Sequence, residues 1–336
     1  MNLINDFFYP TLKFLGLYHA SSTQKLSKEL CDWLDEYNPE VLYGQASSMG
    51  AIQFCQMVQE YLNKPLIFHM MDDWATMLKS EGIFGRFWYN RVEKEFQSLF
   101  DKSNILLSIS ELMAKEYKTR YNKDFIPFHN PIDVEFWKKH RKENKALCDP
   151  PVILYAGRVG TGIETSLEVI AKSVELVNKQ TGIGLQFALQ TPEAPKWISN
   201  YKYTRHNSYV EYKELPKVFA EADFLILPYD FGEEGLNFIR LSMPTKASEY
   251  FASGTPVIIF SPDCTAVVDY AEKHQCALSV TQNDSKKLAE SIIELINDED
   301  LRLKTAQSGV EIADKYHNAI EVRLTFQNIL RSLKHK

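Results

Sequence analysis

The stretch that decides the fold is Leu241-Ser-Met-Pro-Thr-Lys-Ala-Ser-Glu-Tyr-Phe-Ala-Ser-Gly-Thr-Pro-Val-Ile258. We expect it to form a helix that is capped by Ser242, has Pro244 in its first turn and ends at Gly254. The apolar run at residues 256–260 is typical of a buried strand. A helix that leads into a buried strand is one unit of a layered α/β fold.

Lys246 and Glu249 are three residues apart and share one side of this predicted helix. The free N–H groups of a helix start, together with a lysine, suit a diphosphate. The glutamate, one turn further on, is placed to accept hydrogen bonds from ribose hydroxyls. The same spacing also fits an exposed ion pair worth about 0.2–0.5 kcal/mol, so spacing alone leaves both interpretations open.

Apolar, β-branched runs recur along the rest of the chain, and most are followed by a segment with helical periodicity. Runs that are apolar on both faces suit strands buried between helices, which indicates parallel α/β layers. The predicted strands are residues 40–43, 65–69, 104–108, 125–128, 152–155, 185–189, 224–227, 256–260 and 277–280.

A polar segment at residues 134–149 divides these strands into two sets, and a length of 336 residues suits two domains. We therefore expect one α/β domain at 1–148, a second at 149–315 and a last helix at 316–336 that returns to the first domain. Ligands of such sheets bind beyond the carboxyl ends of the strands, so two such domains are expected to face a central cleft.

Composition narrows the function classes. The net charge of −6 and the pI of about 5.8 argue against a partner nucleic acid. The sequence has no apolar run of the roughly 18 residues that span a bilayer, and its start lacks the basic region of a signal peptide. Five cysteines without a CxxC pair fit a reducing compartment. These features predict a cytoplasmic protein.

The pattern Ser-x-Pro-x-Lys-x-x-Glu-Tyr-x-Ala-x-Gly-x-Pro-Val-Ile resembles the donor segment of GT-B nucleotide-sugar glycosyltransferases, close to family 4 of retaining enzymes. Other segments resemble this family in the expected order, and the likeness spans roughly residues 36–315. These segments are Ser108-Ile-Ser-Glu111, Asn130-Pro-Ile-Asp133, Tyr155-Ala-Gly-Arg158 and the helix and strand at 215–228.

The resemblance implies a donor site in the C-terminal domain. Arg158, after Gly157, and Lys246 are expected at the diphosphate, and Glu249 at the ribose. A guanidinium can bind two phosphate oxygens at once. Ser242 is expected at the start of the donor helix. Tyr209 lies in the segment that contacts the base through main-chain atoms in this family.

In the N-terminal domain, the resemblance implies that His69, Asp72 and Asp73 face the sugar at the end of a buried strand. His69 is expected to polarise a hydroxyl, and an aspartate to bind the acceptor or act as a base. The alternative is that the two aspartates only cap the next helix. Adjacent carboxylates are not the DxD motif of metal-dependent glycosyltransferases, so we expect neither a metal nor a cofactor besides the donor.

The sequence departs from the family in three places. Leu241 stands where many members have a second glutamate, and the usual phosphate lysine after the Gly-Arg turn is missing, which increases the expected role of Lys246. The first strand and its glycine-rich turn also have no counterpart before residue 39, so the N-terminal domain is expected to be shortened.

The implied function is transfer of a sugar from a nucleoside-diphosphate sugar to a saccharide or lipid-linked acceptor, in polysaccharide or glycoconjugate synthesis. Retention at the anomeric carbon and peripheral association with the inner face of a membrane belong to this expectation. The alternative is a GT-B-like protein that binds a nucleotide sugar or a partner without turnover. A GT-B epimerase requires further carboxylates and histidines beside the sugar, to which no residue can be assigned.

Overall fold

The computed structural model describes residues 8–14, 24–142, 146–160 and 162–333. Its contacts divide the chain into two compact units. Unit 1 contains the residues up to Phe128 together with those from Phe326 onward, and unit 2 contains His129–Thr325. None of the helices in the described residues has both the length and the apolar character that crossing a membrane requires.

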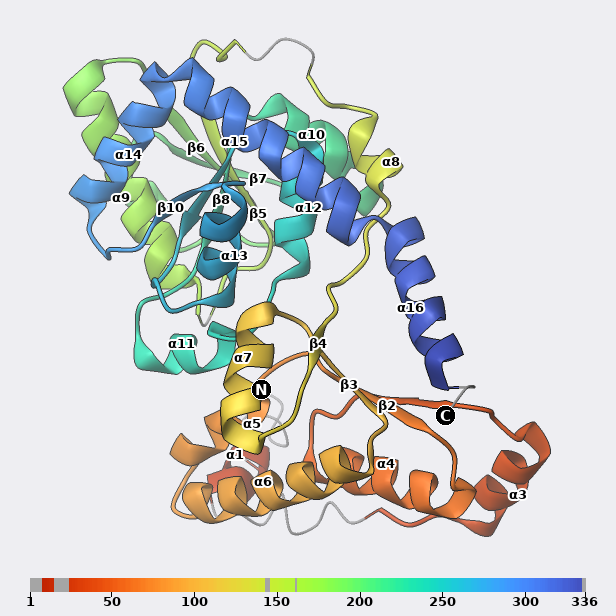
Figure 1. Ribbon diagram of the computed structural model, residues 1–336. Helices are drawn as coiled ribbons and strands as arrows, with labels where there is room; N and C mark the ends of the chain where they lie inside the picture. The colour runs from red at the N-terminus through yellow and green to blue at the C-terminus, as the bar shows by residue number, and fades with distance from the viewer. Residues whose placement is uncertain (1–7, 15–23, 143–145, 161, 334–336) are drawn as a thin grey trace. The chain divides into compact units, whose positions relative to one another are not determined.

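Unit 1 is built on a parallel sheet in which the strands follow their order in the sequence (Figure 1). Its strands are β1 (Leu42–Gly44), β2 (Leu66–Met70), β3 (Ile105–Ser108) and β4 (Ile126–Pro127). β2 is buried along its whole length, as expected for a strand with helices on both sides. All four strands coincide with predicted apolar runs.

Helices cover both faces of the unit 1 sheet. Phe68 of β2 packs against Phe96 and Phe100 of the long helix α6 on one face. On the other face, Ile67 and Leu107 form a cluster with the last turns of α16. The helices of this unit are α1 (Tyr9–Phe14), α3 (Lys28–Tyr37), α4 (Met49–Leu62), α5 (Trp74–Met77), the 3-10 turn η2 (Leu78–Ser80), α6 (Gly85–Lys102), α7 (Glu111–Tyr121) and the end of α16 (Ala319–Leu333).

Unit 2 contains a six-stranded parallel sheet in the order β10-β9-β8-β5-β6-β7. Its strands are β5 (Val152–Ala156), β6 (Gln186–Gln190), β7 (Thr204–Asn207), β8 (Phe224–Pro228), β9 (Val257–Phe260) and β10 (Leu278–Val280). Five of them coincide with predicted runs. β7 has no predicted counterpart because this edge strand reads Thr-Arg-His-Asn, and a strand that is paired on one side only needs no apolar run.

The core of unit 2 lies between the sheet and the helices α9 and α14, while α10 and α12 lie on the opposite face (Figure 1). Gly254 ends α12 in the left-handed conformation, as predicted from its position. The helices and turns are α8 (Val134–Lys138), α9 (Glu164–Thr181), η3 (Ile198–Asn200), η4 (Tyr212–Glu214), α10 (Leu215–Glu221), α11 (Glu233–Ile239), α12 (Thr245–Ser253), α13 (Ala266–His274), α14 (Ser285–Asn297), α15 (Glu299–Ile312), η5 (Ala313–His317) and the start of α16.

The polar segment that suggested a boundary at residue 148 groups with unit 2, because it carries anchors that its composition hides. Trp137 of α8 is buried and stacks on Phe219 at 5.1 Å between ring centroids. The guanidinium of Arg141 donates from Nε to the carbonyl of Ala252 at 2.8 Å. The contacts therefore change over between Phe128 and His129, and the described part of the predicted linker packs against unit 2.

The expected fold class is confirmed: each unit is a parallel α/β sheet covered by helices, as in the two Rossmann-like domains of the GT-B architecture. The expected shortening at the start of the chain concerns a region of which residues 1–7 and 15–23 lie outside the described residues. The described residues before β1 form the helices α1 and α3.

Candidate functional site

A cavity of about 240 Å³ lies at the carboxyl edge of the unit 2 sheet. The strand order reverses between β5 and β8, and open parallel sheets bind their ligands beside such a reversal. Val210, Leu215 and Phe219 supply apolar lining, while Lys246 and Glu249 supply opposite charges. A cavity with an apolar wall and a few charged groups suits a ligand that has both an apolar and an anionic part.

Lys246 projects from the first turn of α12 across the end of β5. Its ammonium lies over the Tyr155 ring at 4.4 Å from the centroid, and Nζ donates to the Tyr155 hydroxyl oxygen at 3.3 Å. It also lies so close to Gly157 that a side chain there would collide with it. Burial lowers the pKa of Lys246 to about 8, Arg158 adds to this shift and Glu249 opposes it.

Glu249 lies one turn further along α12 and is already oriented by a neighbour. The hydroxyl of Tyr212 donates to Glu249 Oε1 at 3.1 Å. The Tyr212 ring is in turn stacked on Phe136 of α8, with 5.4 Å between centroids and planes 4° apart. Burial raises the pKa of Glu249, while this hydrogen bond and Lys246 oppose the rise. The carboxylate is therefore held in one direction at the cavity wall.

Arg158 lies exposed where the cavity meets a second hollow of about 460 Å³. That hollow is also lined by Glu164 and Lys196. Tyr209 is exposed at the cavity rim, on the segment between β7 and α10. The structure thus brings together five of the predicted donor residues, which are Gly157, Arg158, Tyr209, Lys246 and Glu249.

Ser242 differs from its prediction. α12 starts at Thr245 after Pro244, so Ser242 is not its cap. The backbone N–H of Ser242 instead donates to the carbonyl of Ile239, in the turn that closes α11. The prediction failed because Leu241 and Met243 are buried, which holds this segment in a tight turn before the helix begins. Ser242 is not among the residues that line the cavity.

The amino end of α9, at the reversal of strand order, is occupied by a side chain of the protein. Asp230, just after β8, accepts a hydrogen bond from the backbone N–H of Ser166 at 2.8 Å, and the Ser166 hydroxyl donates to the carbonyl of Tyr229. A carboxylate at this position satisfies the positive end of the helix dipole. Arg158 and Lys246 supply positive charge at the same edge of the sheet.

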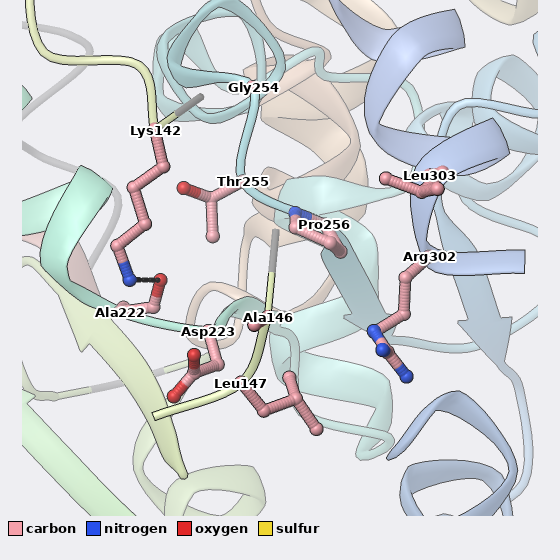
Figure 2. A pocket seen from close by; sticks show the side chains of 10 residues that line it. All are labelled: Lys142, Ala146, Leu147, Ala222, Asp223, Gly254, Thr255, Pro256, Arg302 and Leu303. Carbon is pink, nitrogen blue, oxygen red and sulfur yellow. Dashed lines mark hydrogen bonds between the residues drawn. The ribbon is translucent and has the colours of Figure 1, made fainter. Parts of the chain in front are cut away.

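Figure 2 shows another pocket, at the amino ends of the unit 2 strands. Its charged groups are used for structure: Asp223 accepts hydrogen bonds from the backbone N–H groups of Cys148 and Val152, and Lys142 donates to the carbonyl of Ala222. Arg302 donates to the last carbonyls of α14. Its volume of about 30 Å³ is too small for a substrate.

In unit 1, His69 lies near the end of β2 and is 4% exposed. Its Nδ1 is 2.8 Å from the Tyr43 hydroxyl, and that hydroxyl oxygen accepts a hydrogen bond from the Gln45 side chain at 2.8 Å. These two hydrogen bonds hold the His69 ring in one orientation. The Phe128 ring meets His69 edge-on, at 5.8 Å between centroids.

The two aspartates after β2 differ sharply. Asp73 is buried, and both of its carboxylate oxygens accept from the Arg120 guanidinium, at 2.7 and 2.9 Å. Tyr117 and Thr76 also donate to it, at 2.9 and 2.8 Å. Such an arrangement indicates a structural role for Asp73, at the start of α5. Asp72 is half-buried and is the aspartate that remains a catalytic candidate.

Comparison with known proteins agrees with this geometry. A sequence profile described as "Glycosyl transferases group 1" matches residues 150–298, which make up most of unit 2. Unit 2 is thus similar to the group 1 glycosyltransferases over these residues. The match includes Arg158, Lys246 and Glu249. The resemblance to the GT-B glycosyltransferases is therefore confirmed.

Solved glycosyltransferases resemble the whole chain. Sucrose-phosphate synthase of Thermosynechococcus elongatus is 12% identical, with a TM-score of 0.67 over 90% of this chain and 76% of its own. HepE of Anabaena, in complex with UDP, is 13% identical, with a TM-score of 0.65 over 90% and 81%. A glycosyltransferase of Rickettsia africae is 11% identical, with a TM-score of 0.66 over 91% and 80%. At these identities the likeness shows the fold. No curated protein matches the sequence significantly.

Two residues of unit 2 that the sequence did not single out support the site in the structure. The hydroxyl of Tyr155 donates to the carbonyl of Arg158 at 2.6 Å and so braces the Gly-Arg turn beneath Lys246. Tyr212 orients Glu249, whereas the sequence assigned its segment main-chain contacts only. The one sequence signal for Tyr155 was its place in the strand that leads to Gly157, and Tyr212 had none.

Proposed function

We propose that the chain transfers a sugar from a nucleoside-diphosphate sugar to a saccharide or lipid-linked acceptor. The observation that carries the proposal is the cavity at the carboxyl edge of unit 2, where Arg158, Lys246 and Glu249 lie within the residues that match the group 1 glycosyltransferases. The apolar wall suits a base, the carboxylate suits ribose hydroxyls and the two cations suit a diphosphate.

Catalysis in this proposal is mainly electrostatic. Charge develops on the departing diphosphate, and positive groups that are already fixed in place stabilise it without reorganisation. Lys246 is fixed by Tyr155, and the Gly157 turn leaves room for its ammonium. Retention at the anomeric carbon, a hexosyl donor, independence from metal ions and a role in polysaccharide synthesis complete the proposal, and they rest on the resemblance to family 4.

His69 and Asp72 of unit 1 are proposed to act on the sugar and the acceptor. The hydrogen bond with Tyr43 supports this role for His69 because it fixes the orientation of the ring. Peripheral association with the inner face of a membrane is proposed for a lipid-linked acceptor.

The second candidate function is binding of a nucleotide sugar without turnover. It is favoured by Asp73, a predicted catalytic residue whose carboxylate is bound by the Arg120 guanidinium. It is opposed by the Lys246 and Glu249 pair in the cavity. HepE has been solved with UDP and with UDP-glucose, so these compounds are the first probes. Calorimetry followed by an assay for released UDP tests both functions: binding with release favours the transferase, and binding without release or transfer favours the binder.

We expect Lys246→Ala and Glu249→Gln to weaken binding differently. Loss of a hydrogen bond to a charged group costs about 1.5–3 kcal/mol. For Lys246→Ala this loss is expected with UDP and should nearly vanish with uridine, which has no phosphate. For Glu249→Gln the loss should be similar with both ligands. Calorimetry measures it, and Lys217→Ala, at an exposed position, is the control. Equal losses of Lys246→Ala with both ligands contradict the assignment.

The pKa of Lys246, about 8, predicts a pH dependence for UDP binding. The ammonium binds the diphosphate and the neutral amine does not, so the contribution of Lys246 to the affinity is complete only well below pH 8. Above this value the free protein must take up a proton to bind, and affinity falls as the pH rises. We expect UDP affinity to decline between pH 8 and 10 in calorimetry, whereas Lys246→Arg should stay flat because a guanidinium remains charged. A flat profile for the original protein excludes Lys246 as the phosphate ligand.

A further inference from the structure

An exposed apolar tip surrounded by basic side chains lies on unit 1, at the start of α6. Ile83, Phe84 and Phe87 are 65%, 49% and 56% exposed. Exposed large apolar residues that adjoin one another mark interaction surfaces, whereas scattered single ones do not. Lys79, Arg86, Arg91 and Lys94 are also exposed around this tip. We name these seven residues the α6 patch.

The backbone holds this tip in place. Gly82 has a φ of +63°, and a side chain there would collide with the backbone of Phe14. A side chain at Gly85 would likewise collide with the carbonyl of Leu78. The N–H of Ile83 donates to the carbonyl of Phe14 at 3.3 Å, which ties the tip to α1. Phe14 is itself exposed and extends the apolar surface.

α6 has a buried side and an exposed side. Trp88, Val92 and Phe96 point into the core of unit 1. Arg86, Phe87 and Arg91 are exposed on the rest of the helix surface. The long side chains also lie along aromatic rings: Lys79 Nζ is 4.2 Å from the Tyr89 centroid and Arg91 Cζ is 5.7 Å from that of Trp88.

The charge of this surface is opposite to that of the protein. The whole chain has a net charge of −6, whereas the four basic residues around the tip are exposed and the two acidic residues within residues 79–94 are half-buried. One of the two acids, Glu93, accepts a hydrogen bond from the buried Tyr121 at 2.7 Å and so points inward. Apolar side chains that enter the acyl boundary and cations that stay at the headgroups are the combination that binds an anionic bilayer.

We propose that the α6 patch docks unit 1 on an anionic lipid bilayer. Ile83, Phe84 and Phe87 enter the interface, and Lys79, Arg86, Arg91 and Lys94 contact lipid phosphates. The proposal rests on the proposed peripheral association with a membrane and names the surface that makes it. Every residue of the patch belongs to unit 1, whereas the nucleotide cavity belongs to unit 2. In this arrangement, unit 1 lies on the same bilayer that carries a lipid-linked acceptor.

The test is flotation of the full chain with vesicles of phosphatidylcholine, alone or with about 30% phosphatidylglycerol. We expect flotation with the anionic vesicles at about 0.1 M salt, less at about 0.5 M salt, and little with the zwitterionic ones. Each lost positive charge should weaken partitioning into the anionic vesicles roughly fivefold, so the double variant Arg86→Gln/Arg91→Gln should weaken it about thirtyfold. Ile83→Ser/Phe84→Ser/Phe87→Ser should weaken it on the order of a hundredfold.

Matched controls use the same chemistry on unit 2. Lys286→Gln/Lys304→Gln removes two exposed charges, and Ile320→Ser/Leu324→Ser removes two exposed apolar side chains. Both should float like the original protein. UDP calorimetry and circular dichroism on each variant show that the nucleotide site and the fold are intact, so failure of flotation is distinguished from failure of the proposed function.

Two results overturn the proposal. One is absence of flotation with anionic vesicles at low salt. The other is flotation of the folded serine variant at the level of the original protein. Sedimentation velocity without lipid tests whether the patch binds a second copy of the chain. If the original protein is a dimer, the serine variant is a monomer and neither binds vesicles, the patch is a dimer interface and the proposal is wrong.

Discussion

Replacing His69 by alanine is expected to lower sugar transfer by about 10²–10⁴-fold, the usual contribution of a positioned acid, base or polarising group. His69 is held near the end of β2 by a hydrogen bond between its Nδ1 and the hydroxyl of Tyr43, which fixes the orientation of the ring. Asp72→Ala should have an effect of similar size if this carboxylate binds the acceptor. The measurement is the initial rate of transfer or of UDP release with a donor that binds.

UDP affinity is the internal control for these two variants. The nucleotide contacts that we propose all belong to unit 2, so His69→Ala and Asp72→Ala should leave the calorimetric affinity unchanged. Tyr43→Phe keeps the ring but removes the hydrogen bond to Nδ1, and we expect a smaller loss of rate than for His69→Ala. Full activity of a folded His69→Ala protein contradicts the role of His69.

Replacing Asp73 by alanine is expected to cost about 3–5 kcal/mol of the free energy of unfolding of unit 1. The cost is high because the Arg120 guanidinium, which is mostly buried, loses its bidentate partner while the buried Tyr117 hydroxyl loses its acceptor. Urea unfolding, followed by circular dichroism and tryptophan fluorescence, measures it. The transition of unit 1 should move to lower urea concentration.

Asp101→Ala is the matched control for Asp73. Asp101 also forms an ion pair, with Lys123 at 2.7 Å, but both side chains are substantially exposed. Solvent screens such a pair, so its loss should cost at most about 1 kcal/mol. A loss for Asp73→Ala no greater than this control contradicts the structural role. A loss of turnover without a loss of stability returns Asp73 to the catalytic candidates.

Much of the fold was predictable because its signals are local. The buried strands are continuous apolar runs, and Gly254 at the end of α12 follows from the need for a left-handed residue there. β7 and the buried Trp137 were not predictable in this way. An edge strand needs no pattern of apolar residues. One buried tryptophan within a charged segment does not produce the periodic spacing of apolar residues that predicts a helix or a strand.

The candidate site was also predictable only in part. Lys246 and Glu249 were recognisable because their spacing on one helix is part of a motif, and the structure places both at one cavity. Ser242 was predicted to cap α12 but lies in the turn before this helix. Burial of Leu241 and Met243 outweighs the preference of a serine for the cap position. The catalytic roles of His69 and Asp72 stay predictions.

By itself, the sequence determined the alternation of strands and helices, the position of the glycosyltransferase motif and the pairing of a lysine with a glutamate in it. The tertiary structure decided what each polar side chain binds. Asp72 and Asp73 are neighbours with the same chemistry, yet the partners of Asp73 in α7 lie 44 and 47 residues away along the chain. Spacing describes only what a helix or strand brings together, whereas such contacts exist only once the sheet has formed and α7 has packed beside it.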